Sequence, residues 1–265
     1  MVPLDPAAAW HVRSWLGPPE GPGLLALHHA LAYRVPGLFG DRPGTPRGVL
    51  LVREGTGGVE VFGAGEPEPA VGWLVGNRRP FTLLAPDPWH DAVVARLGEV
   101  EFDRVETWAG AGVASPKRTP PAGASAIVRR LAAKDSAAFL ATAPPWALRG
   151  WRTYPSLVED GAAFGVPHAK GFAAVAWVFD RAESYDAIAA FTAPRFRRLG
   201  LGRAAATALI AHVVRELGQA PLWSARPENA PSVGMAKALG FSVGAVETLL
   251  RWPPRGDKAR GREEP

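Results

Sequence analysis

The residues best suited to chemistry lie in one short segment, residues 195–203, which reads RFRRLGLGR. Gly200 and Gly202 carry no side chain, so an anion can approach the backbone N–H groups beside them. Arginine side chains add positive charge around the same point, at Arg195, Arg197, Arg198 and Arg203. The segment therefore suits a pyrophosphate group, and the alternative is a glycine turn with solvated arginines.

The elements on either side of this segment would aim those N–H groups at a ligand. Residues 187–192 are apolar and predict a strand, and residues 199–217 predict a long helix that Gly218 ends. Apolar residues recur every four positions from Leu201 to Leu217, as on one face of an amphipathic helix. The first turn of such a helix has free N–H groups and the positive end of the helix dipole, which stabilise an anion.

Two common phosphate-binding motifs are excluded at the glycines. No Lys-Ser or Lys-Thr pair follows them, so the segment is not a P-loop. The three-glycine spacing of the dinucleotide fingerprint is absent as well. A different kind of pyrophosphate-bearing ligand is therefore expected here.

Several blocks of sequence together resemble the GNAT family of N-acetyltransferases. Arg197-x-x-Gly200-x-Gly202 is similar to the acyl-CoA signature of that family, Arg or Gln-x-x-Gly-x-Gly or Ala. Downstream, residues 229–232 read NAPS and residues 239–241 read LGF, like the family's Asn-x-x-Ala or Ser segment and its Leu-Gly-Phe. Upstream, residues 128–131 with Asp135 resemble the family's opening strand and helix.

One branch of the family, which includes the zwittermicin A resistance acetyltransferases, is more similar still. The resemblance to this branch rests on residues 164–166, Thr192, residues 221–223 and residues 229–241, together with the signature. That branch also tends to carry an extra N-terminal half, as this chain does.

The resemblance implies an α/β (α+β) fold with a central mixed β-sheet flanked by helices, and acetyl-CoA as co-substrate. In the family, backbone groups of a splayed strand bind the pantetheine arm, and Ala190 and Thr192 occupy those positions. The signature implies a pyrophosphate site at Arg197, Arg198, Gly200, Gly202 and Arg203. Asn229 and Ser232 would hold the far part of the cofactor arm, although Asn229 also fits an ordinary turn and helix entry.

The family's usual chemistry is direct attack of an amine on the thioester, which needs a proton acceptor and a proton donor. Many members place a Tyr seven residues after the Asn, whereas this chain has Ala236 there and no Tyr after Tyr185. Water or Ser232 would then protonate the leaving thiolate. Asp186, eleven residues before Arg197, stands where some members carry the base that deprotonates the amine.

The sequence leaves more than one candidate for the catalytic base. Asp186 could simply end the turn at residues 180–185, and Glu183, Glu159 and His168 are weaker candidates for the base.

The resemblance places the acceptor site near the first helices of the C-terminal half and residues 146–151. In that segment Trp146 and Trp151 either line an apolar wall or belong to the core.

A segment rich in Pro, Gly, Ala and Ser, residues 113–125, predicts a linker between two halves. We expect an N-terminal α/β domain over residues 1–112, a degenerate GNAT-like partner that shapes the acceptor cleft. The acetyltransferase domain is expected over residues 126–252, and a disordered tail over residues 253–265. No internal repeat is evident along the chain.

Hydrophobic patterns predict the elements of both halves. The expected strands are residues 49–52, 59–62, 81–84, 126–131, 162–166, 172–179, 187–192, 222–225 and 243–250. The expected helices are residues 24–33, 87–97 with Asp87 as N-cap, 133–141, 199–217 and 231–239.

The composition excludes several classes of protein. The 265 residues are 47% apolar and 21% charged, which predicts a packed globular core. The chain has no Cys, so disulfides, thiolate metal sites and Cys nucleophiles are excluded. The adjacent His28 and His29 would point about 100° apart on a helix, so they are expected to be ordinary surface or core residues, and no metal site is expected. With neither a secretory signal nor a membrane span visible, a cytoplasmic protein without a membrane partner is expected.

Three functions follow from these patterns. The leading one is an N-acetyltransferase that moves an acetyl group from acetyl-CoA to a primary amine, the partner being a small molecule. The missing Tyr supports a second function, a non-catalytic sensor that binds acyl-CoA. The net charge of +5 and the basic tail suggest a nucleic-acid-associated protein. Interleaved acidic residues and the lack of aromatic residues after Trp252 count against nucleic acid.

Overall fold

The computed structural model describes residues 1–5, 8–18, 22–55, 58–109, 128–169 and 171–254. The chain forms two compact units. Unit 1 comprises Met1–Pro18, Gly37–Val105 and Glu247–Pro265, and unit 2 comprises Pro19–Pro36 and Glu106–Val246. The expected linker and all but the first two residues of the expected tail lie outside the described residues.

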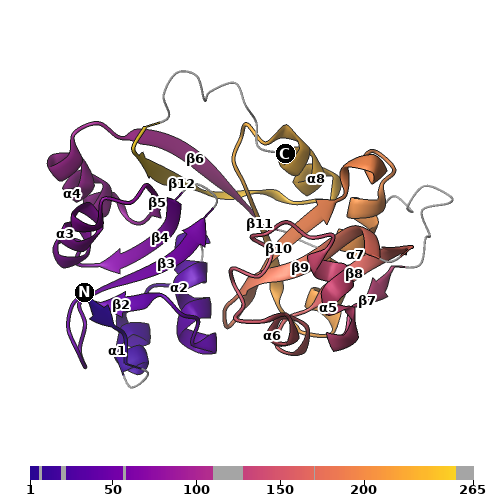
Figure 1. Ribbon diagram of the computed structural model, residues 1–265, viewed down its shortest axis with the longest axis horizontal. Helices are drawn as coiled ribbons and strands as arrows, with labels where there is room; N and C mark the ends of the chain where they lie inside the picture. Colours follow the sequence, from indigo (N-terminus) through magenta and orange to yellow (C-terminus); the bar gives the residue numbers. More distant parts are fainter. Residues whose placement is uncertain (6–7, 19–21, 56–57, 110–127, 170, 255–265) are drawn as a thin grey trace. The chain divides into compact units, whose positions relative to one another are not determined.

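Unit 1 is a mixed sheet with helices packed against it (Figure 1). Its strands lie in the order β1-β2-β3-β4-β5-β12, with a parallel pair β4–β5 and antiparallel pairs elsewhere. Its core surrounds the fully buried Trp89 and Leu83. The elements are β1 (Val2–Pro3), α1 (Ala8–Trp15), β2 (Leu38–Gly40), β3 (Gly48–Gly55), β4 (Gly58–Gly65), α3 (Glu68–Asn77), β5 (Phe81–Leu84), α4 (Asp87–Leu97), the start of β6 (Glu101–Ala109) and the end of β12 (Ser242–Trp252).

The strands of unit 2 are also mixed, in the order β6-β11-β10-β9-β8-β7, with β10–β11 as their parallel pair. Every residue of β9 from Phe172 to Val178 is buried, so this central strand is covered on both faces. The elements are α2 (Pro22–Tyr33), β7 (Arg129–Arg130), η1 (Ala133–Asp135), α5 (Ser136–Leu140), α6 (Tyr154–Glu159), β8 (Ala163–His168), β9 (Gly171–Arg181), β10 (Tyr185–Thr192), η2 (Pro194–Phe196), α7 (Leu201–Arg215), β11 (Ala220–Ala225), α8 (Ala230–Ala238) and the adjoining parts of β6 and β12.

The boundaries of the units differ from the expected division at residues 1–112 and 126–252. Helix α2 belongs to unit 2 because it packs on β9 and β10. Leu25 of this helix is buried in a cluster with Ala182 and Leu222, and its burial stabilises that position by roughly 1.5–3 kcal/mol. The end of β12 belongs to unit 1, where Leu249 and Leu250 pair with β5.

The chain repeats one order of elements, which the sequence did not reveal. The series β1-α1-α2-β2-β3-β4-α3-β5-α4-β6 is followed by β7-α5-α6-β8-β9-β10-α7-β11-α8-β12. In each series the second, third and fourth strands pair antiparallel, and the fourth and fifth pair in parallel. The structure thus confirms an α/β fold with a mixed sheet flanked by helices.

Most expected elements are present, with local corrections. Helix α4 begins at Asp87 with Pro86 as its N-cap, so Asp87 is the first helical residue and no side chain caps the helix. The expected helix 133–141 is a 3-10 turn followed by the short α5. Helix α7 begins at Leu201, two residues later than expected, because Arg198 and Gly200 have left-handed backbone conformations. No helix among the residues that the structure describes has the length and apolar character needed to cross a membrane.

Candidate functional site

Strand β10 separates from β11 partway along its length. The two strands pair only over Tyr185–Ala187 of β10 and Ala220–Leu222 of β11. Residues 188–192 of β10 continue to pair with β9 on the other side. The edge of β10 that faces β11 is therefore open from Ile188 onward, and Ala190 and Thr192 lie in this open stretch. Backbone groups on such an edge can bind an extended ligand as a further strand would.

The arginine and glycine segment lies directly after this open edge. Arg198 has a φ of 65°. Gly200 has a φ of 77° and is the N-cap of α7. No side chain caps the helix, so the N–H groups of its first turn are not occupied by a cap. Arg197 and Arg198 are exposed beside them. The helix dipole and these two cations favour an anion at this point.

Gly202 is required here by close packing. A Cβ atom at this position would stand well inside van der Waals contact of Thr192 Oγ1 and 3.5 Å from Met235 Cε. The glycine therefore lets the end of β10, the start of α7 and helix α8 meet at one point. Any larger residue would have to displace the side chain of Thr192.

Helix α8 lies on the other side of the junction between β10 and α7. The side-chain oxygen of Asn229 accepts a hydrogen bond from Ser232 N–H at 3.2 Å and caps the helix. The indole Nε1–H of Trp223 donates to Ser232 Oγ at 3.0 Å. Because the hydroxyl oxygen accepts this bond, the hydroxyl proton of Ser232 remains available to a ligand. The role of Trp223 was not expected from the sequence, although alternation along β11 places it on the same face of the sheet as Ala225.

Ala236, which stands where the resemblance led us to look for a Tyr, is turned away from this point. Ala236 is fully buried in the core, whereas the neighbouring Met235 is half-buried and approaches Gly202. A thioether is a weak acceptor and donates no proton. Helix α8 therefore presents Ser232, and no hydroxyl from the position of Ala236, to this part of the site.

Asp186 is placed differently from the base that the sequence suggested. It is fully buried, and its two carboxylate oxygens accept hydrogen bonds from Arg181 at 2.7 and 2.6 Å. Arg181 also donates to the carbonyl oxygen of Asp160 and interacts with Tyr33, whose pKa is raised chiefly by burial. Because this carboxylate is 0% exposed and each of its oxygens is paired with Arg181, it is not accessible to an incoming amine. The geometry assigns Asp186 to holding the start of β10.

The weaker candidates for a base lie at the surface. Glu159 and Glu183 are exposed, and the exposed His168 stacks edge-on against Phe196 with ring centroids 4.5 Å apart. The part of the chain that the structure describes contains no cluster of His, Asp and Glu able to hold a metal ion.

The tryptophans of residues 146–151 divide between core and half-buried positions. Trp151 is core: it is 4% exposed, and its Nε1–H donates to Val178 O at 2.8 Å. Trp146 is half-buried and packs on Trp177 with ring centroids 5.4 Å apart. Of the two, Trp146 alone keeps partly exposed surface for an apolar wall.

The adjacent histidines have different environments, as the sequence suggested. His29 is buried, and its Nδ1 accepts the N–H of Arg181 at 2.9 Å. Its Nε2 must then carry the proton and donate to Gly150 O, so the ring is a neutral core histidine. His28 is only partly buried.

The corresponding segment of unit 1 cannot form a second anion site of this kind. Helix α3 follows β4 as α7 follows β10, but its N-cap is Pro67 and Pro69 stands in its first turn. Neither proline has an N–H group. Glu66 and Glu68 add negative charge, and they pair with Arg47 and Arg96, respectively.

Comparisons with known proteins show which families and structures this chain resembles. Residues 163–250, from β8 through most of β12, match the family model described as FR47-like protein. A search of curated protein sequences gives no match. The similarity to the zwittermicin A resistance branch receives no support from the comparisons.

Solved structures show the GNAT-like fold over most of the chain. A GCN5-related N-acetyltransferase-like protein from Streptococcus suis is 17% identical with a TM-score of 0.66, covering 92% of this chain and 99% of that one. A tandem GNAT protein from the clavulanic acid biosynthesis pathway is 14% identical with a TM-score of 0.61, covering 96% and 99%. A GCN5-related N-acetyltransferase from Kribbella flavida is 16% identical with a TM-score of 0.59, covering 89% and 97%.

Proposed function

We propose that the chain is an N-acetyltransferase that uses acetyl-CoA and acetylates a primary amine of a small molecule by direct attack. The observation that carries this proposal is the meeting of the open edge of β10 with the uncapped, arginine-flanked start of α7. Gly202 leaves room at this junction of β10 and α7, because a side chain at this position would fill the space beside Thr192. These features fit the two parts of a coenzyme A molecule, its amide-bearing arm and its pyrophosphate.

Each part of acetyl-CoA has residues that would hold it. The open edge of β10 at Ala190 and Thr192 offers backbone groups to the pantetheine arm. The start of α7 offers N–H groups to the pyrophosphate, at Arg198, Gly200, Gly202 and Arg203, and Arg197 adds a nearby charge. Asn229 and Ser232 would flank the far part of the arm. The bound co-substrate supplies an activated thioester carbonyl.

Ser232 is the residue that we propose as proton donor. Trp223 fixes its hydroxyl oxygen as an acceptor, which leaves the hydroxyl proton free. Ser232 and Met235 are three residues apart on α8, so their side chains share one face of the helix. Because Met235 approaches Gly202, Ser232 lies on the face of α8 that borders the proposed site.

The amine is proposed to react without a carboxylate base from β10. Asp186 is occupied by Arg181 and so serves as a positioning residue for the strand. The substrate then reacts as the neutral amine, which for a pKa near 10 is roughly one molecule in a thousand at pH 7. The rate constant kcat/KM should accordingly rise with pH toward the pKa of the substrate amine.

A panel of small primary amines assayed for thiol release from acetyl-CoA tests the proposal. We expect at least one amine to release free thiol and to yield its N-acetyl product by mass spectrometry. Transfer should disappear in an Arg197→Glu/Arg198→Glu variant that unfolds at the wild-type temperature. Acetyl-CoA binding with no product from any amine, across pH 6 to 10, would refute catalysis.

A second function is favoured by the nature of helix α8. Ala236 is buried and Met235 borders the site, so the hydroxyl group common in catalytic relatives has no counterpart on this helix at that position. A sensor that binds acyl-CoA without turning it over needs no such group. It predicts tight acetyl-CoA binding together with a failed amine panel.

A further inference from the structure

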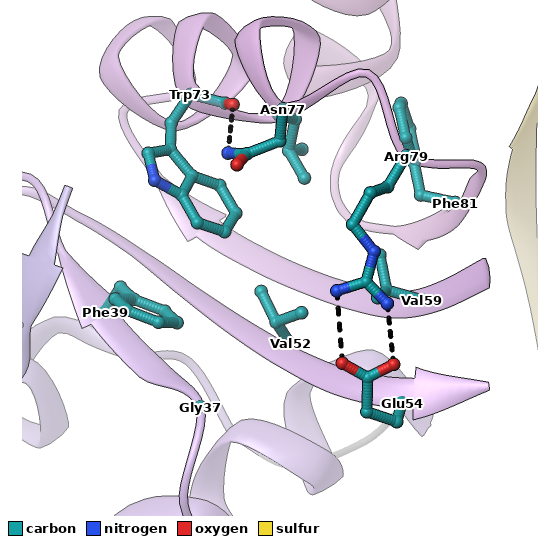
Figure 2. Close-up of a pocket in the computed structure, with 10 residues that line it drawn as sticks. Gly37, Phe39, Val52, Glu54, Val59, Trp73, Asn77, Arg79 and Phe81 are labelled. Carbon is teal, nitrogen blue, oxygen red and sulfur yellow. Dashed lines mark hydrogen bonds and ion pairs between the residues drawn. The ribbon is translucent and has the colours of Figure 1, made fainter.

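Unit 1 contains a pocket of about 310 Å³ between helix α3 and strands β2 to β5 (Figure 2). Its walls are largely apolar, formed by Phe39, Val52, Val59, Trp73, Leu74 and Phe81. Val59, Leu74 and Phe81 are buried, so they form the floor. A volume of this size lies at the small end of the range for sites that hold small molecules.

The mouth of the pocket carries two opposite charges side by side (Figure 2). Arg79 Nη1 and Nη2 donate to Glu54 Oε1 and Oε2 at 3.1 and 2.7 Å, respectively. Both side chains are exposed, at 54% for Arg79 and 75% for Glu54. An exposed pair of this kind contributes little to stability, so a ligand can open it at small cost.

A third polar group lies at the end of helix α3. Asn77 Nδ2 donates to Trp73 O at 2.7 Å, which fixes the orientation of the amide. Within the described part of the chain, the amide oxygen of Asn77 has no hydrogen bond, so it can accept one from a ligand. The pocket thus combines an apolar interior with one cation, one anion and one acceptor at its rim.

We propose that this pocket binds a free α-amino acid with a large apolar side chain. The amino acid carboxylate pairs with Arg79, its ammonium group pairs with Glu54, and its side chain enters between Trp73 and Phe81. A zwitterion replaces both partners of the ion pair at once. A ligand with a single charge would satisfy one of these residues and leave the other without its partner.

This site is independent of the proposed acetyl transfer. It lies within unit 1, whose helix α3 begins with prolines and acidic residues and so does not suit coenzyme A. Its ligand is therefore expected to bind whether or not acetyl-CoA is present. The GNAT-like order of unit 1 would then serve to hold a small effector rather than a second acyl donor.

Calorimetric titration of the full chain with L-phenylalanine tests the proposal. Two matched probes each lack one charge: phenethylamine has no carboxylate, and 3-phenylpropanoate has no ammonium group. We expect one L-phenylalanine per chain, and at least roughly tenfold weaker binding of either probe, equivalent to about 1.4 kcal/mol. Equal binding of all three compounds, or no binding of L-phenylalanine, would overturn the proposal.

Three variants locate the site. Arg79→Gln should weaken L-phenylalanine at least roughly tenfold, whereas Arg78→Gln, a neighbouring exposed arginine outside the pocket lining, should leave the affinity unchanged. Val52→Trp should fill the interior and abolish binding. If Val52→Trp fails to fold, the two arginine variants still decide the matter, because both change exposed side chains. Equal effects of Arg78→Gln and Arg79→Gln would overturn the assignment.

Discussion

Replacing Asp186 by Asn separates a structural role for this residue from a catalytic one. Asp186 is 0% exposed and the Arg181 side chain 13% exposed, so the change leaves a largely buried guanidinium without its anion. Breaking a buried pair typically costs about 3–5 kcal/mol. Arg181 keeps its hydrogen bond to Asp160 O and its contact with Tyr33, so the cost should lie near the lower value, about 3 kcal/mol.

Thermal unfolding measures this cost. About 3 kcal/mol corresponds to a fall in Tm of roughly 6–12 °C for a chain of this size. Glu183→Gln is the matched control, because it removes an exposed carboxylate three residues earlier, and it should leave Tm unchanged. Acetyl-CoA affinity should be unchanged in Glu183→Gln. It should also be unchanged in Asp186→Asn, provided that this variant is assayed below its reduced Tm.

A catalytic role gives the opposite result. Removing a general base typically slows the reaction by a factor of about 10²–10⁴. Unfolding of Asp186→Asn at the wild-type temperature, together with a loss of that size in amine transfer, would refute the structural role. An Arg181→Met/Asp186→Leu double variant extends the test, because replacing both charges by apolar groups should restore much of the stability.

Three further predictions follow from the contacts. Gly202→Ala should lower stability by about 1–3 kcal/mol through its clash with Thr192, and adding Thr192→Ala should recover most of it in thermal unfolding. Ser232→Ala should lower kcat by roughly 10²-fold, and calorimetry should show a much smaller loss of acetyl-CoA affinity; an unchanged kcat would assign the proton to water. The Arg129 guanidinium lowers the pKa of Asp135 to about 2, so the folded state gains stability above the unfolded pKa near 3.8 and loses it as pH falls through 2. As pH falls between those two pKa values, the wild type should therefore lose more free energy of unfolding than Asp135→Asn. Acid titrations followed by circular dichroism measure this difference.

The local patterns of the sequence predicted the elements around the candidate site well. Four-residue periodicity and two glycines were enough to place β10, the loop after it and α7, because these signals depend on neighbouring residues. Helix α3 was missed because Gly72 and Gly76 interrupt its apolar pattern. The repeated order of elements was missed for the same reason, since α3 is the counterpart of α7.

Contacts between distant residues could not be read from the sequence. The spacing of seven residues after Asn229 points to Ala236, but the rotation of α8 turns that residue into the core and brings Met235 next to Gly202. The spacing of Asp186 suggests a base, whereas its pairing depends on Arg181 of the neighbouring strand. The position of β12 beside β5 joins segments more than 150 residues apart, and no local pattern encodes it.

The central claim is that acetyl-CoA binds at the start of α7, and a calorimetric titration tests it most directly. We expect one site per chain with a Kd on the order of micromolar, about 8 kcal/mol. Arg197→Glu/Arg198→Glu should abolish binding, whereas Arg215→Glu, an exposed arginine about 20 Å along the same helix, should not. No binding by the wild type, two equal sites, or an equal loss in Arg215→Glu would contradict the account.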